Sequence, residues 1–396
     1  MQVKKIAVVT FFFGELPWYF RFFQQSCGAN PTVDFIFFTD NQPNRDTPSN
    51  LQFHYFTLPD FNRLATQQLG FTIDIQKGYK VCDLRPAFGV IFADYLTGYD
   101  WWGYTDIDII FGRIREFMTE ELLEHYDVVS VKDEYPTGYF MLLKNSPEVN
   151  KLYTLSKDYQ TVFTAPHNML FEECGGYYTE VCNGMNILDT DCPFETFYHV
   201  LEKEKDRIRS FFDYLVMERT PGLLKWDKGI LGYRNEFEVL LYHLSDYKLN
   251  VFSRKKYWGP MPQTYFIDAH NFRKLSPWGK LTCWWTGRFH PALVNRIRRW
   301  DMWLAARWLR RPMKRLRSGE YYYMKDKVTI RVNDKGHNEI YYANMPQPFS
   351  LLALLFSKDY FFNPDMRRVY RYEGHNFSEI FKDGNLIAYT HTKDIE

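Results

Sequence analysis

The first forty residues alternate between apolar strands and a helix, and this pattern constrains the fold more than any other feature. Ile6 to Phe13 is a continuous apolar run typical of a buried strand, and Val33 to Phe38 is a second one. The segment from about Trp18 to Cys27 between them has the character of an aromatic helix. A strand, a helix and a strand within this length form a βαβ unit, which implies a parallel sheet that binds ligands beyond the carboxyl ends of its strands. We therefore expect an α/β fold with a mostly parallel central sheet.

The same alternation continues along the chain. Further strands are expected at Gln52 to Leu58, Val128 to Val131, Gly138 to Leu143 and Glu236 to Tyr242. Helices are expected at Pro59 to Leu69, Arg85 to Leu96, Ile114 to Tyr126, Glu148 to Phe163 and Glu195 to Lys205, with loops from Cys174 to Phe194. The apolar run near the start is short and lacks a small-residue cleavage site, so we interpret it as a strand rather than a signal peptide.

Two carboxylates one residue apart, Asp106 and Asp108, lie within the apolar segment from Tyr99 to Gly112. In an extended strand both side chains would point to the same face. Carboxylate oxygens suit Mg²⁺ or Mn²⁺, and such an ion makes a nucleotide diphosphate a better leaving group. Many Asp-x-Asp triplets are only surface turns. The apolar flanks make this one a candidate metal site.

Composition excludes some classes of function. The net charge of +1 argues against a general nucleic-acid binder. Cys174, Cys182 and Cys192 match no common zinc module, so we expect reduced thiols and a cytoplasmic location. No apolar run is long enough to span a membrane. Aromatic residues make up 19% of the chain, which supports large cores and sugar-stacking surfaces equally well; core filling is the simpler interpretation.

The C-terminal third has a different character. Residues 291–318 combine tryptophans with many basic residues: Arg296, Arg298, Arg299, Arg307, Arg310, Arg311, Lys314, Arg315 and Arg317. A basic amphipathic helix of this kind suits peripheral contact with an anionic membrane, here the inner face of the cytoplasmic membrane. The alternative is a helix that packs its tryptophans on the protein. The alternation from Val328 to Tyr342, around a turn at Asn333 to Gly336, predicts a β-hairpin.

The order of three motifs after the opening strand resembles that of bacterial glycosyltransferases with the GT-A nucleotide-sugar fold. The motifs are Lys-Val-Cys-Asp-Leu-Arg-Pro (80–86), Gly-Tyr-Thr-Asp-Ile-Asp-Ile-Ile-Phe-Gly (103–112) and Thr-Gly-Tyr-Phe-Met-Leu-Leu (137–143). The likeness is to a family of uncharacterised, capsule- or lipopolysaccharide-associated glycosyltransferases, and it covers roughly residues 1–255. It implies a catalytic domain at 1–255. The C-terminal third departs from it, and its residue pattern predicts a connecting segment at 256–320 and a small β-rich appendage at 321–396.

The resemblance also implies roles for particular residues. In GT-A enzymes the Asp-x-Asp motif binds the divalent cation and the donor diphosphate, which assigns the cation to Asp106 and Asp108, with Asp108 as the direct ligand, and a donor contact to Ile107 between them. His243, after an apolar strand, is in the place of a further metal ligand, with Lys248 near enough in sequence to meet phosphate charge. The alternative for His243 is a half-buried histidine at a strand end.

Other residues are expected to hold the donor, which the resemblance implies is a nucleotide diphosphate sugar, most simply a UDP-sugar. Ends of the first two strands would cradle base and ribose, through Thr10, Phe11, Phe12, Phe13 and Asp40. Lys80, Asp83 and Arg85 would contact the diphosphate or the sugar. Strand-end capping by Asp40 and helix capping by Asp83 are the alternatives.

An inverting enzyme needs a base for the acceptor hydroxyl. Glu172 and Glu173 resemble an acidic pair of the related families, and Asp191 is a further candidate, as are Asp133 and Glu134. A charged surface pair is the alternative. A retaining enzyme need not have such a base.

The leading hypothesis is a metal-dependent glycosyltransferase that moves a sugar from a nucleotide diphosphate to a surface polysaccharide or lipid-linked glycan. A phosphatase that uses Asp-x-Asp would place its nucleophile just after the first strand, unlike this chain. A nucleotidyltransferase would favour a Gly-rich phosphate loop near the first strand, and the sequence has none there. An inactive, membrane-associated glycan-binding scaffold is the non-enzymatic alternative.

Overall fold

A computed structural model describes residues 3–213, 216–217, 224–233, 237–249, 255–267 and 271–278 and, beyond them, the backbone of strands β16 to β22. Its centre is a seven-stranded sheet in the order β3-β2-β1-β4-β7-β6-β8. These strands are β1 (Ile6–Phe12), β2 (Val33–Thr39), β3 (Leu51–Tyr55), β4 (Trp101–Thr105), β6 (Val128–Ser130), β7 (Phe140–Lys144) and β8 (Ser210–Phe212). Strands β3, β2, β1 and β4 run parallel, and β7 runs antiparallel to both of its neighbours. The prediction of an α/β fold with a mostly parallel sheet is confirmed.

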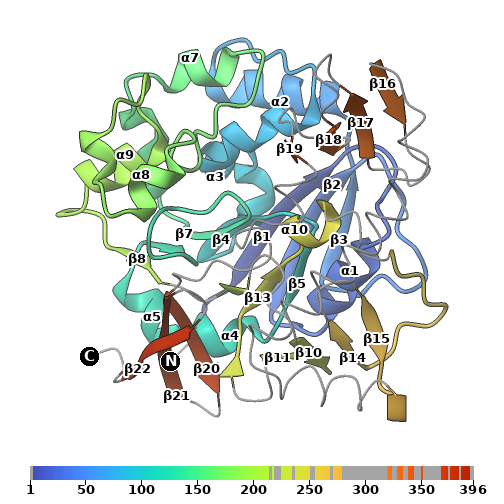
Figure 1. Cartoon of the computed structure of the whole chain (residues 1–396). Helices are drawn as coiled ribbons and strands as arrows, with labels where there is room; N and C mark the ends of the chain where they lie inside the picture. The colour runs from blue at the N-terminus through green and yellow to red at the C-terminus, as the bar shows by residue number, and fades with distance from the viewer. Residues whose placement is uncertain are drawn as a thin grey trace.

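Helices cover both faces of this sheet (Figure 1). The α-helices of the described residues are α1 (Phe20–Gly28), α2 (Leu58–Leu69), α3 (Phe88–Ile91), α4 (Ile114–Phe117), α5 (Glu120–His125), α6 (Pro147–Asn150), α7 (Tyr159–Thr164), α8 (Tyr178–Cys182), α9 (Phe197–Lys203) and α10 (Ser245–Leu249). Ile6 and Val8 of β1 join the core with α1, α4 and α5. Ala7 and Val9 join the opposite core with α2, α3, α7 and α9. The alternation of side chains along β1 therefore feeds two apolar layers.

Local signals set several of these boundaries. Helix α2 begins at Thr57, whose side chain and that of Asp60 cap each other's backbone N–H groups, and it ends at Gly70 in the left-handed conformation. Thr119 accepts a hydrogen bond from the Leu122 N–H and starts α5. Such caps contribute about 1 kcal/mol each.

Three predicted helices are interrupted in the structure. Arg85 to Leu96 is instead divided among the 3₁₀ helix η1 (Gly78–Ala87), α3 and the 3₁₀ helix η2 (Ala93–Leu96). The prediction of one helix from Ile114 to Tyr126 divides into α4 and α5, since Thr119 caps a new helix. The segment from Glu148 to Phe163 divides into α6, the 3₁₀ helix η3 (Leu152–Leu155) and α7.

Two further sheets complete the arrangement around the site. Strand β5 (Ile109–Phe111) lies beside β13 (Leu241–His243), which pairs in parallel with β9 (Val216–Met217). The third sheet has the order β15-β14-β10-β11-β12-β20-β21-β22. Its first strands are β10 (Leu224–Asp227), β11 (Ile230–Tyr233), β12 (Phe237–Glu238), β14 (Thr264–Ile267) and β15 (Phe272–Lys274). The predicted strand from Glu236 to Tyr242 is thus two strands, β12 and β13, in different sheets.

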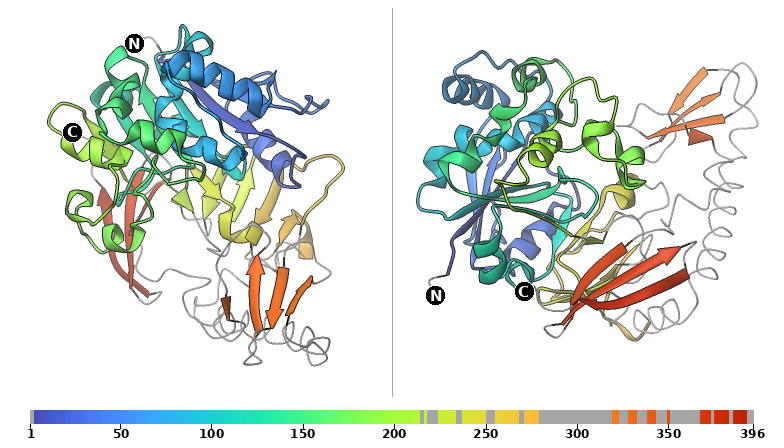
Figure 2. Two further views of the ribbon diagram at one scale, coloured as in Figure 1. Left: turned by 90° about the horizontal axis from the view of Figure 1, so that it is seen from above. Right: turned by 90° about the vertical axis from the view of Figure 1, so that its left-hand side faces the viewer.

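The C-terminal strands form two groups, which Figure 2 shows apart from each other. Strands β20 (Arg367–Tyr372), β21 (His375–Lys382) and β22 (Asn385–Thr392) extend the third sheet from β12. Strands β16 (Gly319–Tyr322), β17 (Val328–Val332), β18 (Asn338–Tyr342) and β19 (Phe349–Ser350) form a separate sheet. Strands β17 and β18 pair antiparallel, as the predicted hairpin requires. The basic segment 291–318 lies outside the described residues, and the predicted domain boundaries stay a prediction.

Within the described part of the chain, no helix has both the length and the apolar character that a bilayer span requires. The cysteines described, Cys27, Cys82, Cys174, Cys182 and Cys192, are free thiols. Burial raises the pKa of the Cys27 and Cys82 thiols well above the ordinary value, so these two are inert core residues.

Candidate metal centre

The Asp-x-Asp motif lies where the chain leaves the central sheet. Strand β4 ends at Thr105, the motif forms a turn, and β5 begins at Ile109 in the three-stranded sheet. The prediction that Asp106 and Asp108 share one face of a strand is therefore wrong. The turn brings their carboxylates together, because the chain changes sheets between them.

A histidine from a distant part of the sequence completes a cluster of three possible ligands. The ligand atoms of Asp106, Asp108 and His243 all lie within 4.8 Å of one another. His243 ends β13, and it is paired in register with Ile109, the residue after the motif. The Asp106 side chain is 34% exposed, whereas that of Asp108 is 4% exposed. The cluster is thus buried at Asp108 and open toward solvent at Asp106.

Lys248 supplies a positive charge at the buried side of this cluster. Its Nζ lies 2.5 Å from Oδ2 of Asp108, and the His243 Nε2 lies 3.4 Å from the same oxygen. Burial acts to raise the pKa of Asp108, but the charges and hydrogen bonds of Lys248 and His243 outweigh it and hold that pKa well below the usual range. Burial opposes the charge of Lys248, yet the carboxylate of Asp108 raises the Lys248 pKa. Asp108 is ionised at neutral pH.

Arg85 supplies a second positive charge, at the open side. Its guanidinium is buried in η1 and donates hydrogen bonds to Asp106 Oδ1 and to the carbonyl oxygen of Gly138. Its Nη1 also lies 3.9 Å from Oε1 of Glu172. Arg85 therefore links the metal-ligand cluster to the predicted acidic pair.

The acidic pair sits directly behind this arginine. Glu172 is 2% exposed, and Glu173 accepts hydrogen bonds from the Gly138 N–H at 2.7 Å and from the Tyr178 hydroxyl. Burial is the largest cause that raises the pKa of both carboxyls, and the neighbouring Asp83 raises that of Glu172 further. A β-carbon on Gly138 would lie 2.8 Å from Glu173 Oε1 and 3.1 Å from Glu172 Oε1, so a larger residue at this position would have to displace the acidic pair.

The residues predicted for base and ribose lie at the ends of β1 and β2. Thr10 is buried, and its hydroxyl donates to the carbonyl of Thr105, just before the motif, at 2.7 Å. The Arg85 guanidinium lies 5.7 Å from the centre of the Phe11 ring. Phe12 and Phe13 are only partly buried and pack on opposite cores. Asp40 is exposed and accepts hydrogen bonds from the Gly14 N–H.

Lys80 and Asp83, which are predicted to contact the sugar donor, have buried partners within the protein. Lys80 donates to Asp83 at 2.7 Å, and both side chains are almost fully buried. Asp83 also accepts the N–H groups of Met169 and Phe171, each at 2.8 Å, and so holds the segment before Glu172 against η1. Asp191 is exposed, and its backbone carbonyl accepts a hydrogen bond from the Tyr177 hydroxyl. The functional roles of these residues stay predictions.

Two tyrosines at the centre were missed by sequence reasoning. Tyr19 lies with its ring centre 5.9 Å from the Lys248 ammonium, and burial raises its pKa to about 12. Tyr139 stacks on His243. In a chain with 29 tyrosines, no local signal distinguishes Tyr19, whereas Tyr139 lies inside the 137–143 motif.

The model of a family of unknown function, DUF6625, matches residues 8–276 of this chain. The chain belongs to that family. Its matched region contains the whole cluster of Asp106, Asp108 and His243, together with Arg85 and Lys248.

Comparison with individual proteins assigns no function to this chain. None of the curated proteins compared with the chain matches it. Among solved structures, the apo form of the glycosyltransferase GlyE from Streptococcus pneumoniae TIGR4 is similar at 12% identity, with a TM-score of 0.25. The match covers 53% of this chain and 45% of the GlyE chain. A TM-score this low does not establish a shared fold.

The donor set of the cluster fits a hard divalent cation. Two carboxylates and one imidazole are ligands that Mn²⁺ accepts, and Mg²⁺ shares the preference for carboxylate oxygens. The ammonium of Lys248 lies on Asp108 Oδ2, so a metal ion bound through this oxygen would compete with it. Asp106, Asp108 and His243 are the residues that could hold the ion.

Proposed function

We propose that this protein is a metal-dependent glycosyltransferase of the GT-A type, which uses a nucleotide diphosphate sugar as its donor. One observation carries the proposal. Asp106, Asp108 and His243 gather their ligand atoms within 4.8 Å at the carboxyl end of β4, in a mostly parallel sheet. Ligands of α/β proteins bind at this edge of the sheet.

The charges around the cluster suit a diphosphate. A bound Mn²⁺ or Mg²⁺ would neutralise the negative charge that grows on the diphosphate as the glycosidic bond breaks. In this proposal Lys248 exchanges its contact with Asp108 for a phosphate oxygen, and Arg85 keeps Asp106 in place. Thr10, Phe11, Phe12, Phe13 and Asp40 border the base and ribose, next to the motif through the contact of Thr10 with Thr105.

Glu172 and Glu173 are the proposed source of a base for the acceptor hydroxyl, with Asp191 as the exposed alternative. Support comes from their position: the pair is joined to Asp106 through Arg85. A carboxyl group with a raised pKa is the stronger proton acceptor once it is ionised. The positive charge of Arg85 favours the ionised form of Glu172, against the larger effects of burial and Asp83, which raise the pKa of this carboxyl.

The acceptor belongs to the same proposal. A cell-surface polysaccharide or lipid-linked glycan is the class that the sequence resemblance implies, and contact with the inner face of the cytoplasmic membrane through 291–318 would bring the protein to it.

A thermal-shift screen tests the proposal. UDP, GDP and CMP, and their sugars, are added with and without Mn²⁺ to the wild type, to Asp108→Asn and to the exposed control Asp94→Asn. A ligand that binds only the folded state raises its stability, by about 2.7 kcal/mol at a hundred times its Kd. We expect one diphosphate to raise the melting temperature only with Mn²⁺, in the wild type and Asp94→Asn but not in Asp108→Asn. Equal shifts in all three proteins, or none, would refute the assignment.

A further inference from the structure

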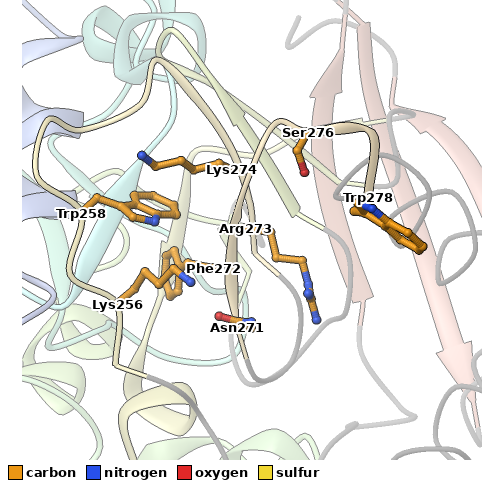
Figure 3. A pocket seen from close by; sticks show the side chains of 8 residues that line it. All are labelled: Lys256, Trp258, Asn271, Phe272, Arg273, Lys274, Ser276 and Trp278. Atoms are coloured by element: carbon orange, nitrogen blue, oxygen red, sulfur yellow. The ribbon is translucent and has the colours of Figure 1, made fainter.

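A pocket lined by basic and aromatic side chains lies between residues 256–258 and the segment 271–278, which includes β15 (Figure 3). Its volume is about 310 Å³, within the size range of small-molecule sites. Three cations line it, together with three aromatic rings: Lys256, Arg273 and Lys274, and Trp258, Phe272 and Trp278. None of the described lining residues is acidic.

One end of this pocket has a fixed aromatic floor. The Lys256 and Lys274 ammonium groups each lie 5.9 Å from the centre of the Trp258 ring, and Figure 3 shows them on either side of it. Trp258 is 7% exposed. The backbone that follows this ring is held by Arg21, which donates hydrogen bonds to the carbonyls of Trp258 and Gly259. Charge and ring are therefore arranged before any ligand binds.

The other end is open. Arg273 points away from Trp258, and Trp278 stands apart from it in Figure 3. The Trp278 side chain is 78% exposed, so most of its surface is open to solvent. The spread of cations and rings over both ends gives room for more than one ring-sized unit.

We propose that this pocket binds acidic sugar residues of the acceptor glycan, which rests on the proposed transferase function. Ring faces pack against the C–H faces of a pyranose, and the cations pair with a carboxylate or phosphate on the sugar. The amide and hydroxyl groups that complete the lining suit the neutral hydroxyls of the same sugar.

Other anionic partners fit less well. A membrane-binding surface presents several rings to the bilayer, whereas among the lining rings only Trp278 is exposed, and Trp258 and Phe272 are buried. A nucleic-acid site needs an extended basic surface, and the chain as a whole carries a net charge of only +1.

A layer of packed rings connects the pocket to the metal centre. Phe272, in the pocket lining, lies 5.1 Å from Tyr247 between ring centroids. Tyr247 precedes Lys248, whose ammonium contacts Asp108. The pocket therefore lies behind the element that positions Lys248, which suits a site that anchors one part of an acceptor while another part reaches the donor.

Calorimetric titration with defined probes tests this. The probes are trigalacturonate and glucose 6-phosphate, which are acidic sugars, and neutral maltotriose; phosphatidylglycerol vesicles and oligo(U) RNA represent the other partners. Lys274→Gln and Trp278→Ala are compared with Lys255→Gln and Tyr257→Ala, which change neighbouring exposed residues outside the lining. We expect the wild type to bind at least one acidic sugar and not maltotriose. Each lining variant should bind it about two- to fivefold more weakly, the size of an exposed cation or cation–π contact, and each control variant should bind as the wild type does.

The site is overturned if maltotriose binds as well as the acidic sugars, if neither acidic sugar binds, or if the control variants lose as much as the lining variants. It is also overturned if only vesicles or only RNA bind. Asp108→Asn separates the two proposals, because it should bind the acidic sugar normally. If the wild type binds acidic sugars with this pattern but does not turn over any donor, the transferase proposal is refuted and the pocket proposal stands. If it turns over a donor but does not bind acidic sugars, the pocket proposal is refuted and the transferase proposal stands.

Discussion

The ring of Tyr139 packs on the imidazole of His243, with 4.2 Å between the ring centroids and 36° between their planes. The carbonyl of the same tyrosine accepts a hydrogen bond from the Asp106 N–H at 3.1 Å. Tyr139 therefore contacts two of the three candidate ligands, one through its side chain and one through its backbone.

Tyr139→Leu should weaken Mn²⁺ binding by roughly tenfold, because residues that orient a metal ligand contribute this much to affinity. Tyr139→Phe keeps the ring and should bind Mn²⁺ like the wild type. Electron paramagnetic resonance of free Mn²⁺ measures both affinities. If the two variants lose the same affinity, the stacked ring does not position His243.

Lys248→Met should affect the ion and the nucleotide in opposite directions. The ammonium competes with a cation for Asp108 Oδ2, so its removal should strengthen Mn²⁺ binding, while binding of the nucleotide diphosphate weakens. We expect the affinity for Mn²⁺ to rise and that for the nucleotide diphosphate to fall by about tenfold each, the size of one charge-assisted hydrogen bond.

Lys225→Met is the matched control for this experiment. Lys225 also forms an ion pair, with Asp227 at 2.7 Å, and both side chains are about one-third exposed. It should change neither affinity. A loss of both affinities in Lys248→Met would contradict the competition between the ammonium and the ion.

Gly138→Ala should destabilise the fold by about 1–3 kcal/mol through overpacking. The new methyl group would lie 2.8 Å from Glu173 Oε1 and 3.1 Å from Glu172 Oε1, and these carboxyls are buried. Gly259→Ala is the control, since a β-carbon at that position would have no other atom within 4 Å, and it should be neutral or slightly stabilising. Urea unfolding of the two variants measures the difference. Equal stability would mean that the acidic pair moves aside freely.

Stability should fall as pH rises from about 4.5 to 7 through Glu134. Burial, opposed by Lys132 and aided by Asp133, raises the pKa of Glu134 from 4.5 to about 7. Between these values the unfolded chain releases the proton that the folded protein keeps, so the free energy of unfolding decreases with rising pH. The contribution is fully present below pH 4.5 and amounts to about 1–3 kcal/mol.

Glu134→Gln should remove this part of the pH dependence, and the exposed Glu124→Gln should leave it unchanged. Urea unfolding of the three proteins at pH 5 and pH 7.5 separates Glu134 from other carboxyls with raised pKa values. A wild-type slope in Glu134→Gln would show that Glu134 is already ionised in the folded protein at pH 5.

Local pattern predicted much of the central sheet. The apolar runs of β1 and β2 and the helix between them are each determined by neighbouring residues, and the prediction placed them within two or three residues. Turns that move the chain from one sheet to another have no such signal. The motif at 106–108 was therefore expected in a strand, and the strand before His243 was expected to be continuous.

The candidate site was predictable as residue types and only partly as geometry. The motif predicts Asp106 and Asp108, the family resemblance implies His243 and Lys248, and the structure brings the four together. The links of Arg85 with Asp106 and of Tyr139 with His243 join residues far apart in sequence. Such contacts depend on how the sheets pack, which no local periodicity encodes.

The change of sheet at the Asp-x-Asp turn has a mechanical consequence. The two aspartates belong to the connection from β4 to β5, while His243 arrives on β13 of the neighbouring sheet. An ion bound by all three residues would hold the β4–β5 connection to β13 of the neighbouring sheet. A distant mutation that shifts one of these sheets relative to the other would then impair metal binding and turnover without changing any of the three ligand residues.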